Sequence, residues 1–460
     1  MRRDVYGFGH KAVLVYGLGS SGRTTALALQ DAGVEVFVWD DNEDFQTGPE
    51  GGMFTVRAPD AIDWTRIGAL VKSPGISLET PLVRAAMAHK VPVMTDVDLL
   101  YRRDNSNGAA FIGITGTNGK STTTALIGHI LRVCGYKVAV GGNIGTPALA
   151  LPELPKNGVY VLELSSYQLE TLTDLQVDGA LLLNLTPDHL ARHGTMEAYL
   201  AAKLRLFDLA KAGAVQVMGV DQPLLRGTAE TRGVTTVSVN GTADYMVTEG
   251  RLTHGLETLM PVDDLEHLPG PHNAQNVACA YALLVPRWCT AAEFHDACQS
   301  FKGLPHRLEK VGKVGEVLFV NDSKATNGDS TVYALQSFAN IYWICGGLPK
   351  TDGLGACVKH LGAVRAAFTI GQATEDFADI LAQHNVPSFK CHTMDVAVRE
   401  AFAAARSEGL EDAVVLLSPS AASMDQFRNF EHRGDTFVNL VQGLITVEQV
   451  ERRVTGRGAS

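Results

Sequence analysis

The sequence predicts an α/β protein with three domains, and three observations support this prediction. Short β-branched runs such as KAVLVYG, FIGITG and VYVLELSS alternate with helical patterns along most of the chain, as in parallel sheets whose strands are connected by helices. The 460 residues exceed what one hydrophobic core usually organises. The polar stretches RRDNSNG and FKGLPHR interrupt the series twice. We therefore predict domains at residues 1–103, 104–303 and 304–460.

The composition favours a soluble globular protein in a reducing compartment. Apolar residues make up 45% of the chain, and no run reaches the roughly 18 apolar residues of a membrane span. The seven cysteines include no CxxC pair, which argues against a disulfide framework and a structural zinc site. The formal net charge of −11 repels polyanions. We expect a cytoplasmic protein with no membrane insertion and no nucleic-acid partner.

The first domain begins with a glycine turn that is typical of nucleotide binding. Strand KAVLVY leads into GLGSSG at residues 17–22 and then into a helix, and Asp40 ends the next strand. Such glycines let the backbone approach a diphosphate at a helix N-terminus. NAD(H), FAD and a UDP-sugar all satisfy this pattern, so the turn alone leaves the ligand open. We predict a Rossmann-like domain.

A second loop, KSPGI at residues 72–76, follows another strand and should lie at the same sheet edge. The residues of the first domain that we expect to contact the nucleotide substrate are Gly19, Ser20, Ser21, Asp40, Ser73 and Gly75.

The central domain contains the strongest single signal, a glycine loop of the kind that surrounds phosphate groups. Strand FIGIT leads into GTNGKST at residues 116–122 and then into a helix, the arrangement in which loop amides and one lysine surround phosphates. The spacing departs from GxxxxGK[ST], because Ile114 occupies the first glycine position. Lys120 should contact the terminal phosphates and Ser121 should ligate magnesium. The expected ATP-binding residues of the loop are Gly116, Thr117, Asn118, Gly119, Lys120, Ser121 and Thr122.

Three side chains beyond this loop are candidates for metal chemistry. Glu163 ends one strand, His189 follows another, and Lys203 lies in the helical stretch MEAYLAAKLRLF. Magnesium prefers oxygen ligands, so Glu163 suits it better than a histidine does. Taken singly, each has an ordinary explanation: a loop partner, a hydrogen-bonded histidine and a solvated lysine.

A more irregular part of the central domain, at about 215–270, reads as strands linked by turns around Asn240-Gly241 and Glu249-Gly250. We interpret it as a small added sheet on a P-loop ATPase-like α/β domain.

Several of these segments together resemble the Mur ligases. TGTNGKST is followed in order by GGNIGTPAL, LELSSYQLE, NLTPDHLARHG and YLAAKLRLF, which are similar to consecutive motifs of that family. The resemblance implies that Glu163 and His189 bind metal with Ser121, that Lys203 is carbamylated, and that Asn143 lies near the muramoyl substrate. Lys120, Glu163, His189 and Lys203 would form the catalytic set. Further ATP contacts are implied at Asn273, Asn276, Arg307, Asp322 and Lys324.

The third domain, predicted to be Rossmann-like, resembles the amino-acid-binding part of the same family. NDSKATN at residues 321–327 is similar to an active-site segment, and LSPSAASMDQFRNFEHRG at 417–434 is close to a stretch of the D-glutamate-adding members. A DNPR-type motif of the diaminopimelate- or lysine-adding members is missing. The implied D-glutamate contacts are Thr326, Lys350, Ser423 and Phe430. The terminal ERRVTGRGAS is expected to be frayed.

The resemblance implies a monomeric ligase that uses ATP and Mg²⁺ to join D-glutamate to UDP-N-acetylmuramoyl-L-alanine. The nearest alternative within the class is a folylpolyglutamate synthase-like ligase. Two alternatives from other classes are a dinucleotide-dependent oxidoreductase, which NAD(H) binding would reveal, and a non-catalytic ATP-binding regulator, which ATP turnover would exclude.

Overall fold

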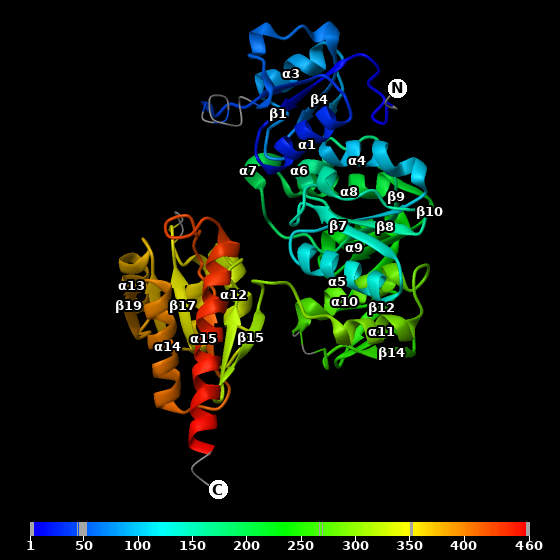
Figure 1. Cartoon of the computed structure of the whole chain (residues 1–460). Helices are drawn as coiled ribbons and strands as arrows, with labels where there is room; N and C mark the ends of the chain where they lie inside the picture. The colour runs from blue at the N-terminus through cyan, green and yellow to red at the C-terminus, as the bar shows by residue number, and fades with distance from the viewer. Residues whose placement is uncertain are drawn as a thin grey trace. The chain divides into compact units, whose positions relative to one another are not determined.

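The computed structural model describes residues 4–43, 45, 53–265, 267–268, 270–349 and 353–456. They form three sheets with helices packed on them, so the predicted α/β class is confirmed (Figure 1). The chain divides into two compact units, Met1–Phe301 and Lys302–Ser460. The division lies close to the boundary predicted at 303/304, and the boundary predicted at 103/104 falls inside the first unit.

The first sheet is parallel, with strand order β3-β2-β1-β4-β5. All five residues of β1 are apolar and buried, because helices cover both faces of this central strand. Its strands are β1 (Ala12–Tyr16), β2 (Val36–Trp39), β3 (Thr55–Val56), β4 (Ile67–Lys72) and β5 (Val93–Met94), and its helices are α1 (Ser20–Asp31), α3 (Pro81–Ala88) and α4 (Asp96–Asp104).

The second sheet has the order β14-β13-β12-β11-β10-β9-β6-β8-β7. Its strands are β6 (Ala110–Thr115), β7 (Lys137–Gly142), β8 (Gly158–Glu163), β9 (Val177–Leu182), β10 (Ala210–Gly219), β11 (Thr235–Ser238), β12 (Tyr245–Thr248), β13 (Arg251–His254) and β14 (Glu257–Pro261). Its helices are α5 (Lys120–Val133), α6 (Ser166–Leu169), α7 (Leu190–His193), α8 (Met196–Asp208), α9 (Pro223–Arg232), α10 (Pro271–Leu284) and α11 (Ala291–Ser300).

The strands expected within 215–270 are present, but they extend this main sheet. β12 and β13 form an antiparallel hairpin around Glu249-Gly250. β11 and β12 are parallel, so Asn240-Gly241 does not close a hairpin.

One apolar cluster continues from the first sheet into the second, which explains why both belong to one unit. It includes Val13 and Val15 of β1, Val97 of α4, and Tyr160 and Leu162 of β8. A separate cluster fills the opposite face of the second sheet, where α5, α10 and α11 pack.

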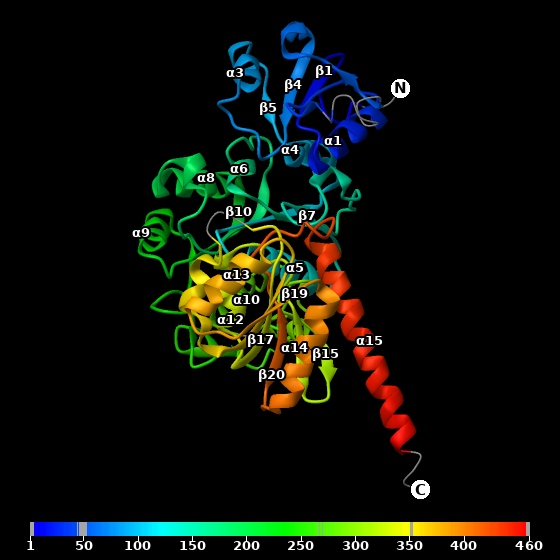
Figure 2. The ribbon, with the colours of Figure 1, turned by 90° about the vertical axis from the view of Figure 1, so that its left-hand side faces the viewer.

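The third sheet has the order β15-β16-β20-β17-β18-β19, with β15 antiparallel to β16 and the other pairs parallel. α14 and α15 cover one face, and α12 and α13 cover the other (Figure 2). The strands are β15 (Glu309–Val314), β16 (Val317–Asn321), β17 (Asn340–Gly346), β18 (Val364–Ile370), β19 (Ser388–His392) and β20 (Ala413–Leu417). The helices are α12 (Gly328–Leu335), α13 (Thr374–Gln383), α14 (Met394–Glu408) and α15 (Phe430–Gly456).

The tail prediction needs a correction, because α15 continues to Gly456 through most of the segment expected to be frayed. Within the described residues, none of the helices combines the length and apolar character needed to cross a bilayer.

Candidate active site

The phosphate loop leaves β6 and enters α5 through two glycines with positive φ. Gly116 has φ 152° and Gly119, which caps α5, has φ 77°. A Cβ on Gly119 would lie 2.4 Å from Oδ1 of Asn276, so this glycine permits close approach of α10. Asn276 in turn donates to Oδ1 of Asn273 at 3.2 Å. Both predicted α10 residues are therefore beside the loop.

Lys120 lies over its own loop. Its Nζ donates to the carbonyl oxygens of Gly116 at 3.0 Å and Thr117 at 2.7 Å. The ammonium is thus held at the N-terminus of α5, where the helix amides also favour an anion.

Asn184, which sequence reasoning assigned no role, fixes the same loop. Its Oδ1 accepts from Asn118 N at 2.9 Å, and its Nδ2 donates to Asn118 O at 3.1 Å. Asn184 O also accepts from Thr117 N at 3.1 Å. The only sequence signal was its place at the start of NLTPDHLARHG, a segment quoted for its histidine.

Glu163 is a buried carboxylate whose surroundings suit a magnesium ligand. It is 2% exposed, and its Oε1 accepts from Asn143 Nδ2 at 2.7 Å. Its Oε2 is buried without a hydrogen-bond partner, which is costly for a carboxylate unless a cation satisfies it. The strand that carries Glu163 and the strand that precedes His189 are not neighbours, because β8 and β9 flank β6 on opposite sides.

The donor set fits magnesium held partly by nucleotide phosphates. In the part of the chain that the structure describes, no three His, Cys, Asp or Glu side chains gather as a metal cluster. Magnesium is usually held by one or two carboxylates together with phosphates and waters. Glu163 and the hydroxyl of Ser121, in the first turn of α5, are donors of this kind.

Lys203 is buried, so the solvated-lysine explanation is wrong. The side chain on α8 is 1% exposed, and its Nζ donates to Gly116 O at 2.8 Å, the carbonyl that Lys120 also contacts. Burial holds the pKa of Lys203 well below its ordinary value, and the charge of Lys120 lowers it further. Both effects favour the neutral amine.

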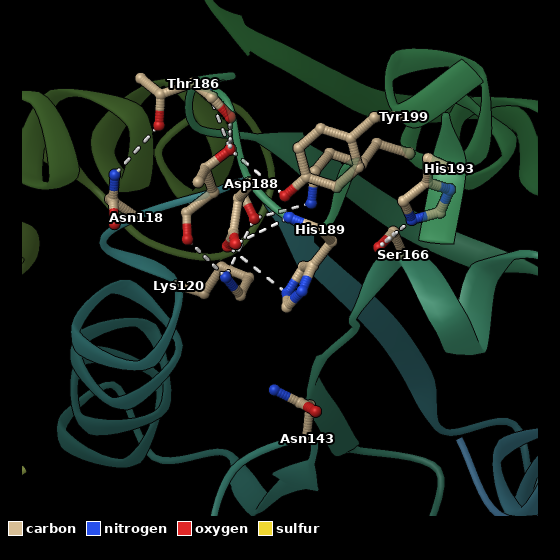
Figure 3. A network of polar contacts seen from close by, with 12 residues as sticks. Asn118, Lys120, Asn143, Ser166, Thr186, Asp188, His189, His193 and Tyr199 are labelled. Atoms are coloured by element: carbon tan, nitrogen blue, oxygen red, sulfur yellow. Dashed lines mark hydrogen bonds and ion pairs between the residues drawn. The ribbon is translucent and has the colours of Figure 1, made fainter. Parts of the chain in front are cut away.

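His189 occupies a left-handed backbone position, with φ 53°, at the N-cap of α7. Its Nε2 lies 3.4 Å from Oδ2 of Asp188, and its ring centroid lies 4.9 Å from that of Tyr167. The side chain is 46% exposed. Figure 3 shows Lys120, Asp188 and His189 close together beside Tyr199, with Asn143 facing them. The structure thus brings the predicted catalytic residues to the carboxyl ends of β6, β8 and β9.

The glycine turn of the first domain is tied together by its own side chains. Asp40 accepts from Leu18 N at 2.6 Å and Asn42 N at 2.9 Å. Ser73 donates to Gly17 O at 3.0 Å. Asp40 therefore orders the turn, a role beyond the substrate contact that the sequence predicts for it.

The remaining predicted residues of this domain lie at the same edge: Gly19 and Ser20 at the start of α1, and Gly75 just after β4. Ser21 donates to Oδ2 of buried Asp96 at 2.7 Å, and that oxygen also accepts from Ala148 N at 3.3 Å. This contact links the first turn to the segment that follows Asn143.

In the second unit, the predicted residues gather around the carboxyl ends of β16 and β20. Buried Asp322 accepts from Ser418 Oγ at 2.7 Å and from Leu308 N, next to Arg307, at 3.3 Å. Burial raises the pKa of Asp322 to about 7. Lys324 Nζ lies 4.0 Å from the ring centroid of Phe430.

Two further D-glutamate predictions lie in the described part of this unit. Thr326 directly precedes Asn327, the N-cap of α12, and Ser423 is buried in the loop after β20. Lys350 lies outside the described residues.

Arg433 is a second residue that sequence reasoning quoted but gave no role. It is fully buried and donates to Ser323 O at 2.9 Å, Ala421 O at 3.0 Å and Ala422 O at 3.2 Å. Burial lowers its pKa to about 10. The guanidinium joins the loop after β20 to the loop after β16.

Comparison with known proteins gives the family. Residues 114–284 match the Mur ligase middle domain, and residues 306–421 match the Mur ligase, glutamate ligase domain. The chain is 45% identical over 446 residues to UDP-N-acetylmuramoylalanine–D-glutamate ligase of Paramagnetospirillum magneticum, covering 94% of this chain and 96% of that one. This chain belongs to the Mur ligase family. The resemblance inferred from motifs is confirmed.

One further relative is similar to this chain in sequence, and two solved structures are similar to it in fold. A protein of the same name from Caulobacter sp. (strain K31) is 42% identical over 467 residues, covering 96% of this chain and 98% of that one. The fold is similar to that of a UDP-N-acetylmuramate–alanine ligase from Thermotoga maritima, with TM-score 0.59 and 17% identity over 94% of this chain and all of that one. MurF from Acinetobacter baumannii gives TM-score 0.58 and 17% identity, over 82% of this chain and 86% of that one.

Proposed function

We propose that this Mur ligase uses ATP to join D-glutamate to UDP-N-acetylmuramoyl-L-alanine, as a cytoplasmic monomer that makes a peptidoglycan precursor. The proposal rests on the 45% identity, over nearly the full length of the chain, to a relative named UDP-N-acetylmuramoylalanine–D-glutamate ligase. The ATP loop, buried Glu163 and buried Lys203 supply the chemistry such a ligase needs.

The reaction has two steps. An oxygen of the L-alanyl carboxylate attacks the γ-phosphorus of ATP, and the bond between that phosphorus and the bridging oxygen breaks. ADP departs, and the substrate becomes an acyl phosphate. The amine of D-glutamate then attacks the acyl carbon to give a tetrahedral intermediate. The carbon–oxygen bond to phosphate breaks, the nitrogen loses a proton, and the amide forms.

Charge compensation falls to the side chains around α5. Lys120 supplies a cation to the terminal phosphates, and the loop amides hold the others. Glu163, Ser121 and His189 would hold Mg²⁺, which neutralises phosphate charge during the transfer. Asn273 and Asn276 beside this loop are also proposed to contact ATP. The same role is proposed for Arg307, Asp322 and Lys324 of the second unit.

Lys203 is proposed to carry a carbamate. Its neutral amine, favoured by burial, adds to CO₂ and loses a proton, so an uncharged side chain becomes an anion with two oxygens. That anion would sit beside Lys120 and compensate its charge.

The substrates are assigned by position. Gly19, Ser20, Ser21, Asp40, Ser73, Gly75 and Asn143 are proposed to hold the UDP-muramoyl part. Thr326, Lys350, Ser423 and Phe430 are proposed to hold D-glutamate, whose two carboxylates need donors and cations.

Phosphate release from ATP tests the proposal. With UDP-N-acetylmuramoyl-L-alanine present, D-glutamate, L-glutamate, L-alanine and diaminopimelate are added in turn. We expect release with D-glutamate alone. Release with another amino acid would contradict the substrate assignment, and no release with any of them would contradict the reaction.

A further inference from the structure

Arg192, a residue to which the reaction above assigns no role, joins the first domain to the turn that carries His189. Its guanidinium donates to Ile76 O at 3.3 Å, in the loop after β4, and to Glu170 Oε2 at 2.8 Å. The loop at 73–76 contains Ser73 and Gly75, both proposed to bind the UDP-muramoyl substrate. A single side chain therefore contacts the substrate loop and the central domain.

The backbone of Arg192 also fixes His189. Arg192 N donates to His189 O at 2.9 Å, and His193 N donates to the same oxygen at 3.1 Å. These bonds hold His189 in its left-handed conformation, with φ 53°, which non-glycine residues rarely adopt. Displacement of Arg192 would therefore alter the turn that aims the imidazole.

A second path runs through Tyr167. The guanidinium carbon of Arg192 lies 5.2 Å from the ring centroid of Tyr167, and the ring of His189 lies 4.9 Å from that centroid. Tyr167 and Glu170 both belong to the segment at α6, so Arg192 holds this segment against the loop by charge and by cation–π contact.

Lys72 makes the same junction sensitive to anions. This residue ends β4 directly before the substrate loop and is 2% exposed, and its Nζ donates to Pro74 O at 3.4 Å, a long hydrogen bond. Burial and, to a smaller extent, the charge of Arg192 lower the pKa of Lys72 to about 8, and the charge of Glu170 opposes this shift. Arg192 pairs with Glu170, and the charges of both residues act on Lys72, so an anionic substrate at the loop would change this balance.

We propose that Arg192 is a positioning residue that couples occupancy of the loop at 73–76 by the UDP-muramoyl substrate to the orientation of His189. The inference rests on the proposed function and deepens it. Substrate contact at Ser73 and Gly75 fixes the Ile76 carbonyl, Arg192 follows that carbonyl, and the turn at His189 is set for the reaction.

The chain offers a matched control in Arg102. Like Arg192, it joins the first domain to the central domain: it donates to Tyr6 O at 3.0 Å, pairs with Asp174, and lies 5.2 Å from the Phe8 ring. None of these three contacts, Tyr6, Asp174 and Phe8, is a proposed site residue. A merely structural role for Arg192 predicts that Arg192→Ala and Arg102→Ala behave alike.

The test compares Arg192→Ala, Arg192→Lys and Arg102→Ala in the full-length enzyme. We expect Arg192→Ala to lower kcat/KM for UDP-N-acetylmuramoyl-L-alanine about 10²-fold, since misplacing a reacting group by about 1 Å has such an effect. KM for ATP should change less, because the Arg192 guanidinium donates to the loop at 73–76. Arg192→Lys should recover part of the loss, and Arg102→Ala should lower the melting temperature while leaving kcat/KM unchanged.

An imidazole NMR signal provides a readout without turnover. The His189 resonance, assigned by its absence in His189→Gln, should shift when UDP-N-acetylmuramoyl-L-alanine is added to the wild type and to Arg102→Ala, and should shift much less in Arg192→Ala. An equal shift in Arg192→Ala, or equal kinetic losses in both alanine variants, would overturn the coupling. Absence of D-glutamate-dependent phosphate release in the wild type would instead overturn the proposed function.

Discussion

The two glycine turns of the first unit have the same local plan and different chemistry. Each follows a buried parallel strand and opens a helix, at residues 17–22 and 116–119. The first is closed by backbone packing: a Cβ on Gly22 would lie 1.7 Å from Gly17 O. The second gathers ionisable side chains, since Nζ of Lys120 and Nζ of Lys203 both donate to Gly116 O.

This difference teaches that a glycine turn supplies only the amides that any phosphate group can use. What separates a binding site from a site of phosphoryl transfer is the set of ionisable side chains delivered by other strands and helices. Around the first turn the ordering carboxylate, Asp40, is occupied by Leu18 N and Asn42 N. Around the second, Glu163 keeps one buried oxygen without a partner.

The largest effect should come from removing the Lys120 ammonium of the second turn. Lys120→Ala should lower kcat about 10³-fold, because one group aimed at developing charge contributes effects of this size. The fold should remain, since the side chain contacts carbonyls of its own loop. Phosphate release and circular dichroism would measure both. A variant with more than a tenth of wild-type turnover would contradict the role.

The first turn should instead be sensitive to shape. Gly22→Ala should destabilise the enzyme by about 3 kcal/mol, because its Cβ would clash with a backbone oxygen that cannot rotate away. Gly19→Ala is the control: its φ is −63° and no atom lies within 4 Å of its Cβ, so its free energy of unfolding should change by less than about 0.5 kcal/mol. Urea denaturation would compare them, and equal losses would refute the steric account.

Substitution of Lys203 tests whether turnover requires the buried amine beside the second turn. Lys203→Ala should lower turnover about 10²-fold while the far-ultraviolet spectrum stays unchanged, since groups that orient a metal site contribute on this scale. Lys211→Ala, which removes a partly exposed ion pair with Asp178, should leave turnover unaltered. Unchanged turnover in Lys203→Ala would remove the carbamate assignment.

The smallest effect should be a change in KM for the ligand of the first turn but not for the ligand of the second. Asp40→Ala removes the acceptor of Leu18 N and should cost about 1 to 2 kcal/mol, seen as about a tenfold rise in KM for the UDP substrate. KM for ATP should not change, because Asp40 belongs to the first turn. Steady-state kinetics with each substrate varied would measure this, and a rise confined to ATP would reverse the assignment.

The local features of this site were readable because they depend on neighbouring residues. Strand, glycine turn and helix follow one another in both turns, and the terminal positions of β6 and β8 place the loop and Glu163 at one edge. Contacts between distant segments were not readable. Asn184 lies 66 positions from the loop backbone that it holds, and Arg433 lies 110 positions from Ser323.

The sequence by itself determined the α/β class, the two glycine turns and, through the order of its motifs, the family. The tertiary structure decided which ionisable groups contact one another and which are buried away from water. The pattern around Lys203 is that of an ordinary helix, and only the packing of α8 onto the sheet excludes water from its amine. The strand order likewise decided that Glu163 and His189 approach the loop from opposite sides of β6, because pairing between distant strands is set by the packing of the whole sheet.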